Sequence, residues 1–255
     1  PKPTTFIERL IKYGFVKKDD IVLDFFSGSG TTAHAAFNYN LKEGQKCQTI
    51  LVQFAENLDE SLTSASTDAK KTIKVAINYL DSLNKKHFIP EIAKERIRRA
   101  GKKIKEEHPE AKDLDTGFRV FRIDESNFED VERTPKEYNQ DQLDLFLNNV
   151  KSDRNDLDLL FGCMLDWGVQ LSLPMSSEVV DGKAIYIVND GDLVACFADK
   201  VTDSVVKAMA DKQPLRVIFR DSCFEQDADK INIYETFKQL LDWSDENVKN
   251  NIRVI

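Results

Sequence analysis

Asp24-Phe25-Phe26-Ser27-Gly28-Ser29-Gly30-Thr31-Thr32 is the stretch that decides the fold of this 255-residue chain. The apolar run Ile21–Phe26, interrupted only by Asp24, predicts a strand buried on both faces, as in parallel sheets. Small and apolar residues at helical spacing predict a helix over Thr31–Tyr39, and Thr49–Ala55 is expected to form a second strand. The quoted stretch is therefore the turn of a strand-loop-helix-strand unit.

The glycines of this turn predict a ligand site at the end of the first strand. Gly28 and Gly30 permit a tight turn and place no Cβ atom in a ligand's way, while the start of the helix offers unpaired N–H groups. Small ligands bind at this end of the strands in open α/β sheets. The pattern Gly28-x-Gly30-x-x-Ala33 also fits the dinucleotide fingerprint, so the loop alone leaves the cofactor open.

Two acidic residues favour a cofactor that carries positive charge. Asp24 stands at the entrance of the loop, where its carboxylate would repel a pyrophosphate but could bond the ammonium of a methionine-derived cofactor. Glu56 follows the second strand and is placed to accept hydrogen bonds from both hydroxyls of a ribose. The plainer alternatives are that Asp24 is a turn-forming acid and Glu56 a solvated strand end.

The rest of the chain predicts further α/β structure in two domains, residues 1–128 and 129–255, with a polar linker over Glu129–Gln142. In the first part we expect a helix over Thr4–Tyr13 ended by Gly14, an exposed loop over Asn57–Lys70, helices from Ile73 and Pro90, and a strand over Gly117–Ile123. In the second we expect helices over Asp158–Leu171, Thr202–Lys212 and Ala228–Trp243, a hairpin of Lys183–Val188 and Leu193–Ala198, and strands over Arg216–Arg220 and Asn251–Ile255.

Composition limits the classes of protein. With 41% hydrophobic and 31% charged residues and no long apolar run or leader, the chain is expected to be soluble and cytoplasmic. Its net charge of -8 disfavours a compact nucleic-acid-binding module, because phosphate binding needs a basic surface. The four cysteines lack a C-x-x-C pair and the three histidines lack ligand spacing, so we expect buried or idle thiols and no metal.

One basic segment stands out in this acidic chain. Between Lys94 and Lys105 there are seven basic residues and the single acid Glu95, a local charge of about +6. On a helix this segment could contact DNA phosphates or an acidic partner. It could equally be a solvated face whose aliphatic stems cover the apolar stripe of Ile89, Ala93, Ile97, Ala100 and Ile104.

Several strings resemble the modification subunits of type III restriction-modification systems, which are DNA adenine-N6 methyltransferases. KPTTFIERLI at 2–11 and LDFFSGSGTTAHA at 23–35 resemble the cofactor motifs, and ILVQFAEN at 50–57 is similar to the acid-ended second strand. The subfamily is indicated by later strings, ERIRRAGKKI at 95–104, GFRVFRIDESNF at 117–128, DLLFGCMLDWGVQLSLP at 158–174 and RVIFRDSCF at 216–224.

The resemblance implies a Rossmann-like S-adenosylmethionine-dependent methyltransferase half-domain followed by a small α/β C-terminal domain. It implies that Asp24, Phe25, Gly28 and Gly30, within a loop completed by Ser27 and Ser29, line the methionine part of S-adenosylmethionine. Thr31 and Thr32, with Lys2 and Thr4, would approach its carboxylate, and Glu56 would hold the ribose. Phe26 or Asn57 could border the adenine, although Phe25 and Phe26 could instead be core residues.

The departure from the family lies in what the chain lacks. These enzymes hold the target amino group with an Asp-Pro-Pro-Tyr or similar tetrapeptide, and no two prolines are adjacent here, so no catalytic residue can be assigned. We therefore expect a C-terminal piece that starts inside a longer protein and is inactive alone. The resemblance implies double-stranded DNA, a restriction subunit and a second modification subunit as partners. An NAD-binding domain and a non-catalytic assembly module remain the alternatives.

Overall fold

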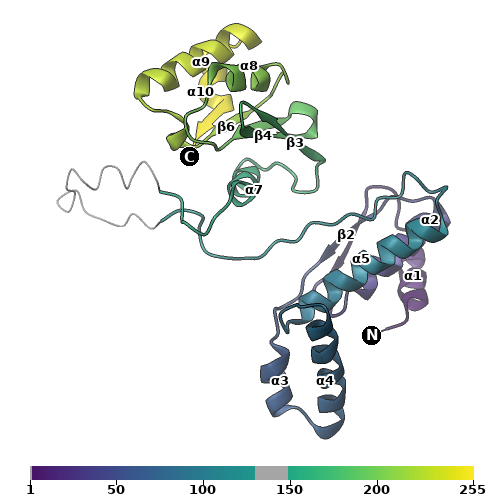
Figure 1. Cartoon of the computed structure of the whole chain (residues 1–255). Helices are drawn as coiled ribbons and strands as arrows, with labels where there is room; N and C mark the ends of the chain where they lie inside the picture. The colour runs from purple at the N-terminus through teal and green to yellow at the C-terminus, as the bar shows by residue number, and fades with distance from the viewer. Residues whose placement is uncertain (1, 130–148) are drawn as a thin grey trace. The chain divides into compact units, whose positions relative to one another are not determined.

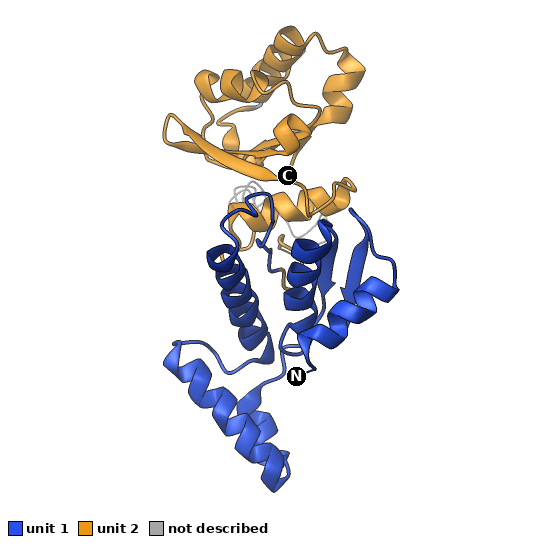
Figure 2. Ribbon diagram, turned by 90° about the vertical axis from the view of Figure 1, so that its right-hand side faces the viewer, with its two compact units in different colours: residues 1–120 blue, residues 121–255 orange. Residues whose placement is uncertain are grey.

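The computed structural model describes residues 2–129 and 149–255, a mixture of helices and sheets in two compact units. The first unit is Pro1–Val120 and the second is Phe121–Ile255, coloured separately in Figure 2. The functional boundary predicted at 128/129, between a cofactor-binding part and an assembly part, stays a prediction. The predicted linker lies, apart from Glu129, outside the described residues.

The strand-loop-helix-strand unit is present in the first unit. Helix α1 (Thr4–Tyr13) precedes strand β1 (Ile21–Asp24), helix α2 (Thr31–Glu43) and strand β2 (Gln48–Leu51). The two strands pair in parallel, with Asp24 opposite Leu51. The prediction of α1 and its end at Gly14 is confirmed, whereas α2 continues four residues past Tyr39, to Gly44 as its C-cap.

Helix α2 is the centre of the first unit, because its two flanks pack against different helices. On one flank Ala35, Ala36 and Tyr39 bury against Ile11 of α1 and against Val22 of β1. The other flank packs against α5 (Ile89–Glu107), which runs beside α2 in Figure 1. Of the predicted stripe, Ala93, Ile97, Ala100 and Ile104 are buried, and Ile89 is partly buried. Pro90 lies at the first turn of α5, as expected.

The prediction that the first strand is buried on both faces is wrong. Ile21 is 57% and Leu23 48% exposed, and Ile50 and Val52 on the same face of the β1–β2 sheet are 46% and 47% exposed. The alternate residues Val22 and Leu51 pack under the helices. Helices of the first unit therefore cover one face of this two-stranded sheet, while the apolar residues of the other face are about half exposed.

Two other expectations for the first unit are also wrong. The segment expected as a loop contains α3 (Leu58–Ser64) and the start of α4 (Thr67–Ser82). The helix expected from Ile73 is the later part of α4, whereas α3 and the start of α4 were not predicted, because both helices are polar and bury only Leu58 and Leu80. The expected strand over Gly117–Ile123 is absent, and its aromatic rings pack individually, Phe118 beneath the Arg98 guanidinium and Phe121 edge-on to Phe161.

The second unit is a five-stranded sheet with helices on both faces. Along the sheet the order is β3 (Met175–Val180), β4 (Lys183–Val188), β5 (Leu193–Cys196), β6 (Val217–Phe219) and β7 (Ile252–Val254). The strands from β3 to β5 are antiparallel, and those from β5 to β7 are parallel. Successive side chains of β6 alternate, so Val217 and Phe219 enter one core and Ile218 the other.

The helices of the second unit alternate with its strands along the chain, as expected from the sequence. Helices α8 (Asp203–Ala210), α9 (Asp227–Leu241) and α10 (Asp245–Asn251) supply the core that contains Phe219, and α7 (Asp156–Asp166) supplies the opposite core. The predicted hairpin and the α/β alternation are confirmed, with most elements shorter than expected. Strand β3 and helix α10 were not predicted, and α7 ends five residues before Leu171.

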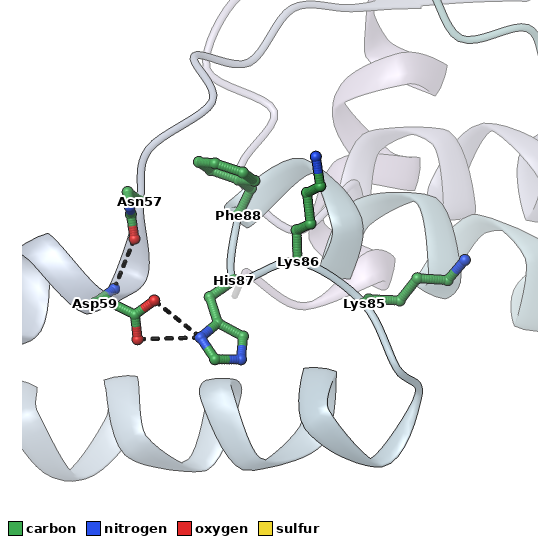
Figure 3. A pocket seen from close by; sticks show the side chains of 6 residues that line it. All are labelled: Asn57, Asp59, Lys85, Lys86, His87 and Phe88. Atoms are coloured by element: carbon green, nitrogen blue, oxygen red, sulfur yellow. Dashed lines mark hydrogen bonds and ion pairs between the residues drawn. The ribbon is translucent and has the colours of Figure 1, made fainter.

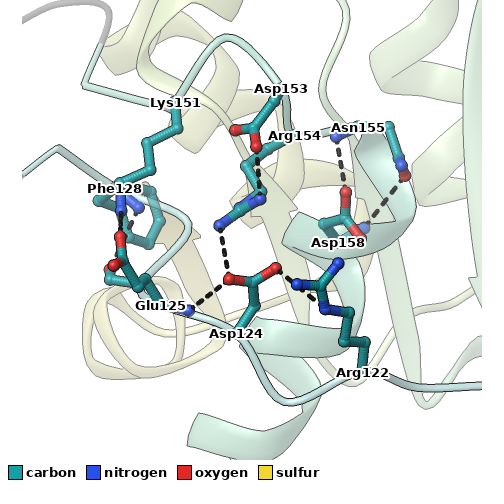
Figure 4. A network of polar contacts seen from close by, with 10 residues as sticks. Arg122, Asp124, Glu125, Phe128, Lys151, Asp153, Arg154, Asn155 and Asp158 are labelled. Atoms are coloured by element: carbon teal, nitrogen blue, oxygen red, sulfur yellow. Dashed lines mark hydrogen bonds and ion pairs between the residues drawn. The ribbon is translucent and has the colours of Figure 1, made fainter. Parts of the chain in front are cut away.

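A polar network ties residues 121–129 to the start of α7, which explains why the second unit begins before residue 129 (Figure 4). Arg154 pairs with Asp124 at 3.8 Å, and Lys151 pairs with Glu125 at 3.0 Å. Asn127 donates to the carbonyl of Asp158 over 2.8 Å. Asn155 caps α7 in a capping box that is completed by the Asp158 carboxylate.

The four cysteines are free and buried, as the sequence predicted. Burial raises the pKa of Cys163 to about 11 and that of Cys223 to about 12, so both thiols stay protonated and unreactive near neutral pH. Across the described ranges, no helix combines the length and the apolar character that spanning a membrane requires.

Candidate functional site

The glycine loop joins the carboxyl end of β1 to the start of α2, and its backbone is held from within the protein. Gly28 and Gly30 have φ angles of +50° and +72°, in the left-handed region that glycine tolerates best. The N–H of Gly28 donates to Oε1 of Gln53 over 2.7 Å, and the N–H of Ser27 donates to the carbonyl of Val52 over 3.2 Å. The segment after β2 therefore shapes the loop.

Asp24 closes the first turn of the loop with both carboxylate oxygens. Its Oδ1 accepts from the N–H of Phe26 over 3.1 Å, and its Oδ2 accepts from the hydroxyl of Thr32 over 2.5 Å. A turn-forming role for Asp24 is therefore real. Because Asp24 is only partly buried, its negative charge also lies at the entrance of the loop.

Arg96 of α5 reaches the opposite side of the loop. Its Nη1 donates to Oγ of Ser29 over 3.0 Å and to Oγ1 of Thr31 over 2.8 Å. Burial lowers the pKa of Arg96, although a guanidinium remains charged at any physiological pH. The loop thus has a carboxylate at one end and a guanidinium behind the other.

Unpaired backbone donors remain at the start of α2. The N–H groups of Ser29, Thr31 and Thr32 have no hydrogen-bond partner in the part of the chain that the structure describes. Unpaired N–H groups at a helix start carry partial positive charge and favour a negatively charged group. The start of α2 is therefore suited to an anionic part of a ligand, while the Asp24 end is suited to a cationic part.

The two loop glycines face different surroundings. A Cβ atom at Gly28 would approach only the carbonyl oxygen of Phe26, at 3.9 Å, so this side of the loop is open. A Cβ atom at Gly30 would come within 3.3 Å of Ala93 and Ile97 of α5. Gly28 thus leaves room for a ligand, whereas Gly30 allows α5 to pack closely.

The aromatic residues of the loop point out of the core. Phe25 is 63% and Phe26 90% exposed, so neither ring belongs to the core that the described residues form. Glu56 is also exposed, and its Oε1 accepts from the hydroxyl of Ser61 over 2.6 Å. Asn57 caps α3 by accepting from the N–H of Asp59, so its side chain has a structural role beside any contact with a ligand.

Lys2 and Thr4 lie at the same end of the unit as the glycine loop. Helices α1 and α2 run in the same direction, because Glu8 bonds Asn38 and Lys42 while Lys12, further along α1, bonds Glu43. The start of α1 at Thr4 therefore lies toward the start of α2 at Thr31. Lys2 precedes α1 and is exposed.

A shallow apolar hollow lies between α1 and β1. Its polar lining residues are Asp24 and Thr32, and its apolar lining comes from α1, Val16 and β1. A second hollow, shown in Figure 3, contains Asn57, Asp59, Lys85, Lys86, His87 and Phe88. In that hollow His87 bridges two helices, with Nδ1 2.9 Å from Asp59 of α3 and Nε2 2.9 Å from Asp81 of α4.

Gln53 and Arg96 were missed as loop-shaping residues. Arg96 was grouped with the basic residues of its segment, yet it follows Ala93 by three positions and precedes Ala100 by four, which places it beside the buried stripe. Its neighbours on α5 pair locally, Lys94 with Glu91 and Arg99 with Glu95. Such ion pairs favour the solvated-face interpretation for most of this segment, and contact with DNA phosphates stays a prediction.

Comparison with known proteins places the loop within a recognised family. Residues 1–43, from α1 to the end of α2, match a family model described as DNA methylase. The Type III restriction-modification enzyme EcoP15I Mod subunit of Escherichia coli is 31% identical over 93% of this chain and 33% of its own length. The StyLTI Mod subunit of Salmonella typhimurium is 36% identical over 57% of this chain and 18% of its own length.

A type II relative is similar over a shorter part. The Type II methyltransferase M.KpnI of Klebsiella pneumoniae is 33% identical over 32% of this chain and 19% of its own length. The chain thus spans a third or less of each of these three relatives. The similarity to Mod subunits nevertheless extends over nearly all of the chain, including the second unit, and so identifies it as a member of the family of type III restriction-modification Mod subunits.

Proposed function

We propose that this chain is the S-adenosylmethionine-binding part of a site-specific DNA adenine-N6 methyltransferase of a type III restriction-modification system. The observation that carries the proposal is the placement of Asp24 at the entrance of a glycine loop, within the segment that matches the DNA methylase family. When bound, S-adenosylmethionine supplies a methyl group on a sulfonium. A carboxylate beside the loop favours the positive charges of that cofactor and opposes a pyrophosphate.

Each predicted residue has a proposed place around the cofactor. Asp24, Phe25, Ser27, Gly28, Ser29 and Gly30 would surround its methionine part, and Lys2, Thr4, Thr31 and Thr32 would lie toward its carboxylate. The exposed rings of Phe25 and Phe26 support contact with a ligand. Glu56 would hold the ribose by exchanging its bond with Ser61 for the ribose hydroxyls, and Asn57 would border the adenine.

We further propose that β1 and β2 belong to the larger sheet of a Rossmann-like methyltransferase domain, of which this chain carries one half. The apolar face of Ile21, Leu23, Ile50 and Val52 is about half exposed, although such residues normally face a second layer. The greater length of the relatives leaves room for the other strands, the tetrapeptide and the target-recognition part. By this reasoning the chain alone transfers no methyl group to DNA.

The second unit is proposed to serve assembly with a second modification subunit and a restriction subunit. The full-length subunit offers a test: removal of residues 129–255 should reduce the number of subunits per particle, calculated from the mass in solution, while S-adenosylmethionine binding is kept. If cofactor binding disappears and the number of subunits per particle is unchanged, this region belongs to the methyltransferase core instead.

Calorimetry on the 255-residue chain tests the cofactor proposal. S-adenosylmethionine should bind, more weakly than to the whole enzyme, and NAD should not. Gly28→Val should abolish binding, because it fills the open side of the loop, and Asp24→Asn should weaken it by removing the charge.

The matched control is Gly44→Val. Gly44 also has a positive φ angle, +63°, and a Cβ atom added to it would meet no other atom within 4 Å, so this variant carries similar backbone strain at the far end of α2. The control variant should bind S-adenosylmethionine like the original chain. Binding that survives Gly28→Val unchanged would remove the loop from the site, and preference for NAD would replace the proposed cofactor.

A further inference from the structure

We propose that Arg96 is a positioning residue, which is anchored by the hydroxyl of Thr31 and orients the hydroxyl of Ser29 to receive the carboxylate of the cofactor's amino-acid part. The proposal rests on the proposed function and assigns a role to a residue outside the glycine loop. Its basis is the pair of hydrogen bonds from Nη1 of Arg96 to Ser29 at 3.0 Å and to Thr31 at 2.8 Å.

The direction of these hydrogen bonds determines whether the two hydroxyls can donate or accept toward a ligand. A guanidinium has only donors, so the oxygens of Ser29 and Thr31 must both act as acceptors toward it. The hydroxyl protons are then left to donate elsewhere. Ser29 is partly exposed, so its proton can point toward a ligand beside the loop, whereas Thr31 is 8% exposed and anchors the guanidinium. A group that only accepts hydrogen bonds, such as a carboxylate, fits the Ser29 donor.

The unpaired backbone groups point to the same chemistry. The N–H groups of Ser29 and Thr31 lack partners in the described chain and sit beside the hydroxyls that Arg96 holds. The guanidinium adds a full positive charge behind these donors, in surroundings that partly exclude water. Backbone donors, hydroxyl donors and positive charge together favour an anionic ligand group.

Asp24 gives the loop the opposite character at its other end. Thr31 and Thr32 are consecutive helical residues and so point in directions about 100° apart. Thr31 bonds the guanidinium and Thr32 bonds the carboxylate of Asp24. The loop is therefore positive on the Arg96 side and negative on the Asp24 side, which complements a zwitterionic amino acid whose carboxylate lies at the N–H groups at the start of α2 and whose ammonium lies toward Asp24.

Arg96 contacts the glycine loop, whereas other basic residues of α5 pair with acidic residues of the same helix. Arg98 and Arg99 contact Glu95, and Lys102 and Lys103 lie near Glu106 and Glu107. The basic side chains of these pairs are half or more exposed and follow the helix surface. Arg99 is thus a suitable control, because its removal takes away the same charge from the same helix and leaves the loop contacts of Arg96 in place.

The test compares two ligands on the full chain by calorimetry. S-adenosylhomocysteine carries the amino-acid group, and 5′-methylthioadenosine lacks both its carboxylate and its ammonium. Arg96→Gln should weaken binding of S-adenosylhomocysteine by about tenfold or more, as expected when charge-assisted bonds are lost, and should change methylthioadenosine binding less than about twofold. Arg99→Gln should alter neither affinity.

Ser29→Ala provides a second variant that leaves Arg96 in place. It should also weaken S-adenosylhomocysteine selectively, and it keeps the test informative if Arg96→Gln does not fold. Equal weakening of both ligands by Arg96→Gln, or no weakening of either, would overturn the proposal while leaving the cofactor site intact. If the original chain bound neither ligand nor S-adenosylmethionine, the proposed function itself would fail, and this proposal with it.

Discussion

Gly30 lies so close to Ala93 that a Cβ atom added to the glycine would stand 3.3 Å from both the Cβ and the carbonyl oxygen of that alanine. Gly30 is the N-cap residue of α2, and Ala93 belongs to the buried stripe of α5. The contact couples the shape of the glycine loop to the packing of a helix more than sixty residues later in the sequence. Two small residues at one crossing thus bring Arg96 within reach of the loop.

Gly30→Ala should destabilise the first unit more than Gly44→Ala does. Both glycines have positive φ angles, so each alanine carries a backbone cost of roughly 1–2 kcal/mol. Only the alanine at position 30 also presses on α5, which adds about 1–3 kcal/mol if the helix has to shift. Hydrogen exchange of α2 and α5 peptides in the full chain measures the difference. Equal protection in the two variants would show that α5 accommodates the methyl group freely.

The sequence predicted the elements whose residues have strong local preferences. The glycine turn, α1 with its stop at Gly14, and the stripe of α5 were all visible because glycine conformation and apolar spacing act within a few residues. Helix α3 was missed because its stability depends on the Asn57 cap and one buried leucine. The exposure of Leu23 could not be read from its own sequence, because burial on the second face depends on a layer that the sequence pattern does not specify.

The site was predictable in part for the same reason. Asp24 and the glycines follow one another along the chain, so their proximity needed no tertiary information. Gln53 and Arg96 reach the loop only through the sheet and the α2–α5 crossing. Their roles depend on contacts between residues that are 25 and 65 or more positions apart, and periodicity carries no direct sign of such contacts.

Asn155→Ala should lower the free energy of unfolding of the second unit by about 1 kcal/mol. The Asn155 side chain accepts from the N–H groups of Leu157 and Asp158 at the start of α7, and alanine leaves those donors unpaired. Urea unfolding followed by tryptophan fluorescence measures the effect, because Trp167 closes the same helix. Asn155→Ser keeps a capping oxygen and should recover most of the loss; a serine variant as unstable as the alanine one would contradict the capping role.

Rising pH should loosen α3 from α4 through His87. Hydrogen bonds to Asp81 and then to Asp59 raise the pKa of His87 above its usual value of 6.5. Because the pKa of His87 is raised in the folded protein, the stability that its ion pairs contribute is complete below pH 6.5 and is lost as pH rises through the folded pKa. NMR titration of His87 and amide exchange in α3 measure the effect: deprotonation of His87 and faster exchange in α3 should occur over the same pH range. After correction for the intrinsic effect of pH on exchange, amide exchange in α3 of the His87→Gln variant should not depend on pH. A pH dependence that persists in this variant would show that another group causes it.

Through His34, the first unit should lose stability as pH falls, whereas the contacts of His87 are lost as pH rises. Its Nδ1 atom is buried in α2 and has no hydrogen-bond partner among the described residues. Burial lowers the pKa of His34, the nearby charges of Arg96 and Lys103 lower it further, and Glu8 acts in the opposite direction. Because the folded pKa lies below the unfolded value of 6.5, the unfolded chain binds the proton first, and stability is lost as pH falls from 6.5 toward the folded value.

The measurement is hydrogen exchange of α2 peptides in the full chain between about pH 7.5 and 5.5, after correction for the intrinsic rate. This window lies above the usual range in which Glu8 and other carboxyl groups titrate. Protection of α2 in the original chain should fall across the window, whereas His34→Gln should hold a flatter profile because its amide does not titrate. A parallel fall in both proteins would place the acid-sensitive group elsewhere, and a rise in the original chain alone would show that His34 gains a partner when it is protonated.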